Sequence, residues 1–217
     1  MKKRDRKNYR TAAWLLGSFI LWTVAVRVID VQAIGPQGSA VGFAEVNRFV
    51  HQLTGVHLSL YTVTDCLSLI PFCFVTGFAL LGLMQWIRRK HLLKVDRSIL
   101  VLGGFYFVVA ACYIFFELVI INHRPVLIDG ILEASYPSST TMLVICVMTT
   151  ALMQFHARIG NRALKHCITA SIISFILFMV VGRLISGVHW FTDIIGGILL
   201  SAGLVSLYHA VIHMDIT

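Results

Sequence analysis

Three short segments of the sequence combine arginine, histidine, hydroxyl and carboxyl side chains, and each lies beside a long apolar run. They span residues 117–125, 136–140 and 182–193. Their chemistry-bearing residues are Glu117, His123, Arg124, Ser138, Ser139, Thr140, Arg183, His189 and Asp193. Charged and hydroxyl donors of these kinds bind phosphate oxygens in proteins. The residue types therefore predict a phosphate site, provided that the fold brings the three segments together.

All three segments supply anion-binding groups. Arg124 and Arg183 can each hold phosphoryl oxygens through paired N–H bonds. Pro137 suits the first turn of a helix. The hydroxyls and backbone N–H groups of residues 138–140 would then lie at a helix N-terminus, which is a natural position for an anion.

His189 and Asp193 have the spacing of a nucleophile and its orienting group. Because they are four residues apart, they share one face of a helix. The Asp193 carboxylate can hold one ring N–H of His189 and leave the other nitrogen free to attack. Taken with the arginines, this pair predicts phosphoryl transfer to a histidine.

The elements that must position these residues are membrane-spanning helices. The sequence is 58% hydrophobic with a mean hydropathy of +0.83, which is typical of a membrane protein. A helix needs about 20 apolar residues to cross a bilayer. Six runs meet that length, over residues 12–30, 58–87, 98–121, 138–155, 167–185 and 189–209. We therefore expect an all-α fold, a single six-span domain over residues 1–217.

The distribution of basic residues predicts the orientation of these spans. Of the 18 Lys and Arg residues, 14 lie in three segments, which are the tail 1–10 and the loops after the second and fourth spans. The positive-inside rule places these segments, and with them both termini, in the cytosol. The phosphate site would then face the extracytoplasmic side of a cell membrane. The net charge of +8 does not indicate nucleic-acid binding, because the basic residues cluster between apolar runs.

The connecting segments add little further chemistry. The longest outer loop, residues 31–57, has apolar residues at helical spacing over 41–53, so we expect a short interfacial helix there. The five cysteines lie in or beside apolar runs without a C-x-x-C pair, which argues against a disulfide framework or a metal site. We expect no cofactor.

The order and spacing of the three segments resemble the type 2 phosphatidic acid phosphatase superfamily. That family's motifs are K-x-x-x-x-x-x-R-P, P-S-G-H and S-R-x-x-x-x-x-H-x-x-x-D. The matching positions here are Arg124, Pro125, Pro137, Ser138, Arg183, His189 and Asp193. The resemblance implies a membrane lipid-phosphate phosphatase in which His189 forms a phosphohistidine. Asp193 would orient the ring, and the two arginines would bind the phosphoryl group without a metal.

Three positions depart from the family motifs, namely Glu117 for lysine, Thr140 for histidine and Gly182 for serine. The family histidine at the Thr140 position is the general acid that protonates the leaving group, and a threonine hydroxyl cannot replace it near neutral pH. A diphosphate expels phosphate, whose second pKa is about 6, and needs little such help. The preferred substrates are therefore a polyprenyl diphosphate, then phosphatidylglycerol phosphate, then phosphatidic acid.

Other interpretations of the same residues remain open. Glu117 and Thr140 also favour a pseudoenzyme that binds a lipid phosphate without hydrolysing it. Glu117 could instead recognise a cationic head group in a phosphotransferase. In a phosphatase, His123 could supply the general acid that Thr140 cannot. A transporter ranks last, because the sequence shows no inverted repeat.

Two carboxylates need partners if they lie among these groups. We expect Glu117 to pair with Arg124 or to be protonated. Asp65 lies within the second span, where an ionisable residue needs a partner. We expect it to pair with Arg27 or Arg183.

Overall fold

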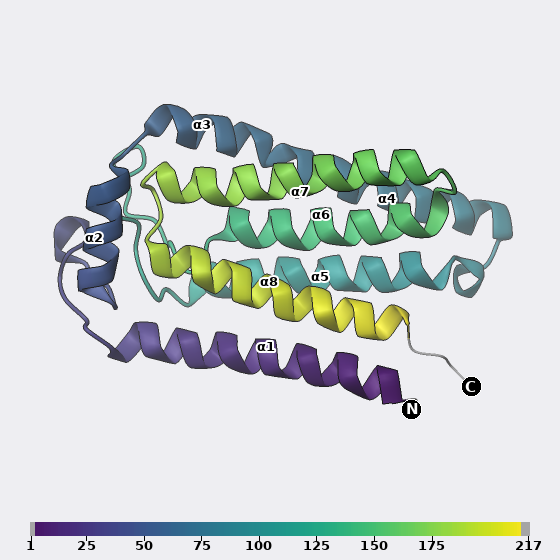
Figure 1. The fold of residues 1–217 in the computed structure, drawn as a ribbon, viewed down its shortest axis with the longest axis horizontal. Coiled ribbons are helices and arrows are strands. Elements are labelled where there is room, and N and C mark those ends of the chain that lie inside the picture. Colours follow the sequence, from purple (N-terminus) through teal and green to yellow (C-terminus); the bar gives the residue numbers. More distant parts are fainter. Residues whose placement is uncertain (1–2, 214–217) are drawn as a thin grey trace.

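The apolar runs form long, nearly parallel helices in the computed structural model, which describes residues 3–213 (Figure 1). Six candidate spans are present in this part of the chain, which confirms the expected all-α membrane bundle. The helices are α1 Lys3–Val28, α2 Ala44–Thr54, α3 Leu58–Leu67, α4 Leu69–Arg89, α5 Arg97–Leu118, α6 Ser139–Arg158, α7 Arg162–Ile185 and α8 Phe191–Ile212. Short 3₁₀ turns, η1 Pro36–Gly38 and η2 Leu92–Lys94, interrupt the connections.

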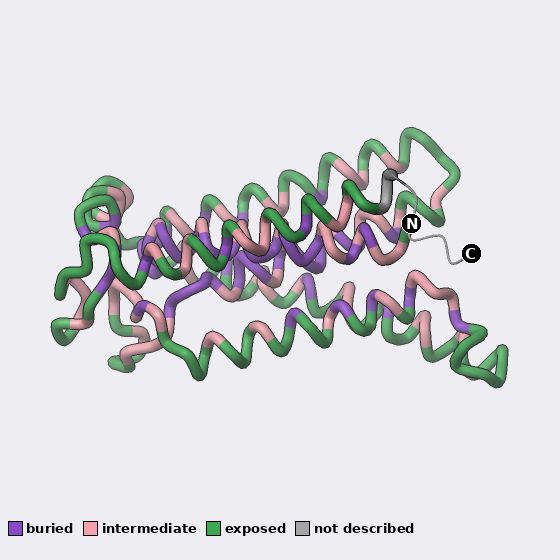
Figure 2. Tube along the Cα trace, turned by 90° about the horizontal axis from the view of Figure 1, so that it is seen from below, coloured by how far each residue is buried: buried purple, intermediate pink, exposed green. Residues whose placement is uncertain are grey.

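Helices α6 and α8 form the centre of the bundle. In each of them 56% of the apolar stretch is buried, against 22% or less in the other four spans (Figure 2). The outer helices therefore leave their apolar side chains for lipid, whereas α6 and α8 pack against protein on most sides. Functional groups carried by α6 and α8 are held by this packed centre.

The second span is broken into α3 and α4, a feature that the sequence reading missed. Ser68 separates the two helices, and Pro71 lies in the first turn of α4. Proline has no N–H, and its ring clashes with the carbonyl four residues earlier, here that of Leu67 at the end of α3. The break lies one turn after Asp65.

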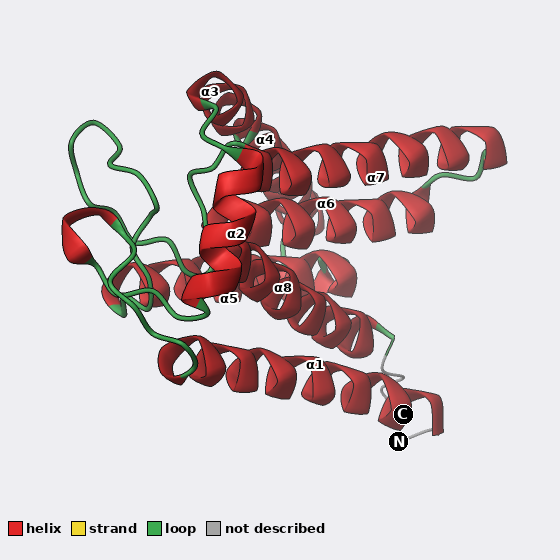
Figure 3. Cartoon of the chain, turned by 60° about the vertical axis from the view of Figure 1, so that its left-hand side comes forward, coloured by secondary structure: helices red, strands yellow, loops and turns green. Residues whose placement is uncertain are grey.

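Helix α2 confirms the short helix expected in the first long loop, with bounds of Ala44–Thr54 in place of 41–53. It crosses one end of the bundle (Figures 1 and 3). The buried Asn47 side chain fastens it there: its Nδ2 donates to Thr192 Oγ1 at 3.0 Å, and its Oδ1 accepts from Thr192 N at 3.2 Å. The start of α8 is thus tied to α2.

The turn between α7 and α8 packs closely against the end of α2. Gly187 has a φ of +69°, and a Cβ placed on it would lie 2.1 Å from the Gly55 carbonyl oxygen. The His57 N–H donates to the Ser186 carbonyl at 3.0 Å. Only glycine fits position 187, because both its backbone conformation and its surroundings exclude a side chain.

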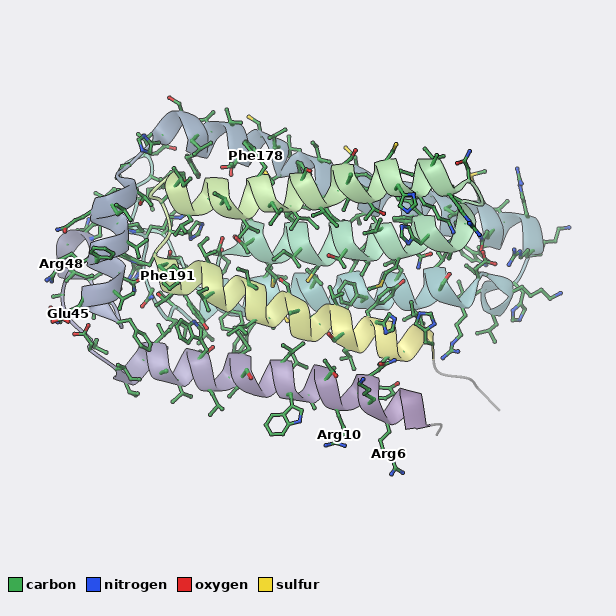
Figure 4. All side chains as sticks on the ribbon, viewed as in Figure 1. Arg6, Arg10, Glu45, Arg48, Phe178 and Phe191 are labelled. Atoms are coloured by element: carbon green, nitrogen blue, oxygen red, sulfur yellow. The ribbon has the colours of Figure 1, made fainter. Side chains whose placement is uncertain are left out.

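The two ends of the described bundle differ in character. Helix α1 begins, and helix α8 ends, on the side opposite to α2. Figure 4 shows Arg6 and Arg10 on that side. Figure 4 places Phe191, the first residue of α8, at the α2 end. Helix α1 starts at Lys3 rather than near residue 12, so most of the expected basic tail is helical.

Candidate active site

The three polar segments meet at the α2 end of the bundle. The first follows α5, the second leads into α6, and the third is the turn between α7 and α8. Pro137 lies before the helix rather than in its first turn as expected, because Ser138 is the N-cap of α6 and accepts from Thr141 N at 3.4 Å. The Ser138 N–H donates to the Asp193 carbonyl at 3.0 Å and so joins the second segment to the third.

The loop between α5 and α6 folds back on itself as two short antiparallel stretches. His123 and Ala134 form an isolated bridge, and Ser135 N donates to the Asn122 carbonyl at 2.9 Å. This pairing places the Asn122 and Ser135 side chains beside α8. Gly196 of α8 permits the approach, because a Cβ there would lie 2.6 Å from the Tyr136 ring.

Asp193 is fully buried and receives several donors. Its Oδ2 accepts from the Trp190 N–H at 2.9 Å and from the Ser135 hydroxyl, and its Oδ1 accepts from Asn122 Nδ2 at 3.1 Å. Trp190 is the N-cap of α8 and Asp193 is its third residue, so the bond from the Trp190 N–H to Asp193 is that of a capping box. The helix start itself therefore fixes the orientation of this carboxylate.

His189 lies beside Asp193 but does not bind it directly. Its Nδ1 is 3.9 Å from Asp193 Oδ2, beyond hydrogen-bond range, and 3.2 Å from Ser135 Oγ. The expectation that the carboxylate itself holds the ring N–H is therefore wrong. Asp193 Oδ2 accepts instead from the Trp190 amide and the Ser135 hydroxyl.

The free nitrogen of His189 is available for chemistry. The side chain is buried, and its Nε2 has no hydrogen-bond partner. Burial lowers the pKa of His189 to about 4, the charges of Arg124 and Arg183 act in the same direction, and Asp193 opposes them. The imidazole is thus neutral near pH 7, with a lone pair on one ring nitrogen. Both arginines are close enough for their charges to act on the ring.

Arg183 is held at the centre of the site. It is 2% exposed, its Nη2 donates to Asp65 Oδ1 at 3.1 Å and to the Thr140 hydroxyl, and its Nε and Nη1 have no partner. The guanidinium lies 5.0 Å from the centroid of the Tyr61 ring. The expected pairing of Asp65 is observed with Arg183, whereas Arg27 donates to the Ile120 carbonyl.

Arg124 pairs with Glu133 rather than with Glu117 as expected. Its Nε lies 2.9 Å from Glu133 Oε2, and its own backbone N–H donates to the Glu133 carbonyl at 3.1 Å. The antiparallel loop places Glu133 directly opposite Arg124, which a linear reading of the sequence could not show. The Nη1 of Arg124 is buried without a partner, and the guanidinium lies 5.8 Å from the Tyr61 centroid.

A cavity of about 660 Å³ is lined by Arg124 and Arg183, whereas His189 and Asp193 are not among the described residues that line it. Both arginines and three carboxylates line it together with apolar side chains. The polar lining includes Asp65, Glu117, Arg124, Glu133, Ser139, Thr140 and Arg183. The apolar lining includes Phe72, Val75, Val109, Met142, Leu143 and Val147. This combination suits a molecule with a charged head and an apolar tail.

The remaining candidates differ in their placement. Thr140 and Ser139 line the cavity at the N-terminus of α6, and Glu117 lines it from the end of α5. His123 is not among the described residues that line the cavity; its carbonyl accepts from Trp190 Nε1 at 2.8 Å. Its position offers no support for a role as the acid.

Sequence reasoning missed four residues of the site, which are Ser135, Asn122, Tyr61 and Glu133. Ser135 lies two residues before Pro137, so its closeness to the second motif was the available signal. Asn122 lies within the first motif segment, directly before His123, which was a similar signal. Nothing in the sequence marks Tyr61, because its contacts come from α3 packing against α7.

Comparisons with known proteins address the family and the fold of this chain. The model of the PAP2 superfamily matches residues 105–216. A solved structure described as the first transmembrane PAP2 type phosphatidylglycerolphosphate phosphatase from Bacillus subtilis superposes with a TM-score of 0.64 at 15% identity, over 95% of this chain and 99% of that one. No curated protein matches the chain. The family match covers more than half of the sequence and all three motif segments, and the chain therefore belongs to the PAP2 superfamily.

Proposed function

We propose that this protein is a membrane lipid phosphatase that works through a phosphohistidine. One observation carries the proposal: a buried, neutral imidazole with an unpartnered Nε2 lies near two arginines that also have buried nitrogens without hydrogen-bond partners, namely Nε and Nη1 of Arg183 and Nη1 of Arg124. Buried donors without partners are costly unless a ligand satisfies them. A phosphoryl group supplies oxygens for the arginines and phosphorus for the imidazole.

The proposed reaction has two steps. His189 Nε2 attacks phosphorus, the bond between phosphorus and the leaving oxygen breaks, and the leaving group departs with that electron pair. The two guanidinium groups neutralise charge on the phosphoryl oxygens. Water then attacks the phosphohistidine, the P–N bond breaks with its electron pair returning to Nε2, and inorganic phosphate leaves. The chemistry requires no metal.

Thr140 directs the proposed choice of substrate. Its hydroxyl accepts from Arg183, so it serves the arginine and offers no acid near neutral pH. An alkoxide leaving group requires a proton, whereas a phosphate leaving group does not. We therefore expect a lipid diphosphate, with a polyprenyl diphosphate ahead of phosphatidylglycerol phosphate and phosphatidic acid. The apolar wall of the cavity would receive the lipid chain.

A non-hydrolytic lipid-phosphate binder is the second candidate, and the charges of the site favour it. Each arginine already has a carboxylate partner, Asp65 or Glu133, and Glu117 adds a third negative group to the cavity. A dianionic phosphate meets more repulsion here than it would beside unpaired arginines. Glu117 also keeps a head-group phosphotransferase under consideration, which product analysis with an added alcohol would reveal.

Phosphate release by the purified protein distinguishes these functions. The panel contains a polyprenyl diphosphate, phosphatidylglycerol phosphate and phosphatidic acid. We expect the diphosphate to react fastest. We expect His189→Ala to lower the rate of phosphate release by at least about 1,000-fold. His156→Ala, in the last turn of α6 at the opposite end of the bundle, is the control and should retain activity. Equal, background-level release by wild type and His189→Ala on every substrate would establish the binder instead.

A further inference from the structure

The contact between His189 and Asp193 runs through a third residue, Ser135. The direct Nδ1 to Oδ2 distance is 3.9 Å, whereas Ser135 Oγ lies 3.2 Å from Nδ1 and donates to Oδ2. Ser135 is 3% exposed, so water cannot readily substitute for its hydroxyl. We infer that Ser135 is a positioning residue that transmits the hold of Asp193 to His189 and fixes the ring tautomer. This inference rests on the proposed role of His189 as nucleophile.

Counting donors and acceptors gives the direction of each bond. A serine hydroxyl has one hydrogen, and a carboxylate oxygen can only accept. Because the Ser135 hydrogen goes to Asp193 Oδ2, its oxygen can only accept from His189. The proton of the neutral ring must then be on Nδ1, which leaves the lone pair on Nε2, the nitrogen without a partner. The relay therefore selects the nucleophilic tautomer.

Asp193 cannot take over this role by moving towards the ring. The Trp190 amide holds Oδ2 at 2.9 Å, Asn122 Nδ2 holds Oδ1 at 3.1 Å, and the Asp193 carbonyl accepts from Ser138 N. These bonds keep the carboxylate at its distance from His189. Loss of the serine hydroxyl should therefore leave the Nδ1–H without an acceptor instead of producing a direct pair.

The relay also matters after attack. Bond formation at Nε2 makes the ring cationic, with the proton still on Nδ1. The negative charge of Asp193 then stabilises the phosphoimidazolium through the polarised Ser135 hydroxyl, because hydrogen bonds in a chain strengthen one another. Removal of the hydroxyl should slow formation of the phosphoenzyme more than it weakens substrate binding.

The activity test is a double-mutant cycle on the active full-length protein. We expect Ser135→Ala to lower kcat by about 10- to 100-fold with little change in KM, and Ser135→Thr, which keeps the hydroxyl, to restore most of the rate. Asp193→Asn should lower kcat by a much smaller factor in the Ser135→Ala background than in the wild type. Ser201→Ala is the matched control, since Ser201 is equally buried and bonds only within α8 and to α6. The inference would be overturned if Ser135→Ala had the same kcat as that control. It would also be overturned if the loss of kcat in the double mutant equalled the product of the losses in the two single mutants.

A second readout does not depend on turnover. The ring ¹⁵N chemical shifts of His189 are measured by NMR in ¹⁵N-histidine-labelled protein at pH 7, and its signals are assigned by their loss in His189→Ala. We expect the Nδ1–H tautomer in the wild type and a mixture of the two tautomers in Ser135→Ala. The Nε2–H tautomer in the wild type would refute the relay even if the enzyme is active. The Nδ1–H result in an inactive protein would keep the relay and reject the proposed function. A thermal unfolding curve for each variant separates misfolding from loss of positioning.

Discussion

Single side chains determine the chemistry that this site can support. His189 is neutral because burial disfavours its charged form, and the nearby arginines add to that effect. The same arginines are oriented by carboxylates, so the site presents directed donors and a limited net charge. A histidine that is neutral over a wide pH range suits a nucleophile, which must keep its lone pair.

The pH profile tests this state at the residue scale. With the pKa of His189 lowered to about 4, the ring stays neutral from pH 7 to 5, and activity is lost only as pH falls through about 4. The acid limb of kcat/KM, which reports the free enzyme, should therefore lie near pH 4. Measurement with an ordinary substrate and with a thiophosphate analogue of lower phosphate pKa separates enzyme from substrate ionisation. A limb near 6.5 with both substrates would contradict the lowered pKa.

At the scale of elements, the site depends on how α2 and the α7–α8 turn pack. Asn47 binds both the side chain and the backbone N–H of Thr192 at the start of α8, and Gly187 fits against Gly55. His189 lies two residues after this glycine. The position of the imidazole is therefore set by a helix more than 130 residues away in the sequence.

Gly187→Ala tests that packing. The new methyl would lie 2.1 Å from the Gly55 carbonyl and would also strain a φ of +69°. We expect a loss of about 1–3 kcal/mol in unfolding free energy and at least tenfold in activity, measured by thermal unfolding and phosphate release.

Gly130→Ala is the matched control for this variant. Gly130 has a similar φ of +79°, but open space surrounds its would-be Cβ, so the substitution adds strain without a clash. It should retain most of the activity. Equal loss in both variants would attribute the effect to backbone strain alone.

At the scale of the whole molecule, charge separates the two ends of the bundle. The basic clusters lie at the end where α1 begins and α8 ends, and the candidate site lies at the α2 end. The positive-inside rule then predicts a site on the extracytoplasmic face. Polar substrate heads would approach from that side, with the lipid chain along the apolar cavity wall between α4, α5 and α6.

Cysteine labelling in intact cells tests this orientation. Asp129 lies exposed in the loop after α5, and Lys94 lies exposed in the loop after α4 at the other end. A membrane-impermeant maleimide should label Asp129→Cys from outside and should label Lys94→Cys only after permeabilisation, with the wild type as background. The reverse pattern would place the site in the cytosol.

The sequence by itself determined the class of fold, because apolar runs long enough to cross a bilayer can satisfy their backbone only as helices. It also identified the family, since the motif segments keep their order and most of their residues. The four-residue spacing predicted correctly that Asp193 lies near His189, but the pair does not share a helix face, because α8 begins at Phe191 and His189 lies in the turn before it.

Only the tertiary structure decided which groups from distant segments touch. The partner of Arg124 is Glu133, which the folded loop brings opposite to it, and the link from His189 to Asp193 passes through Ser135 of another segment. Asp65, one turn before the break at Ser68, accepts from Arg183 of α7. Contacts of this kind depend on loop pairing and helix packing to within about 1 Å, and no periodicity along the chain encodes distances between elements that are remote in sequence.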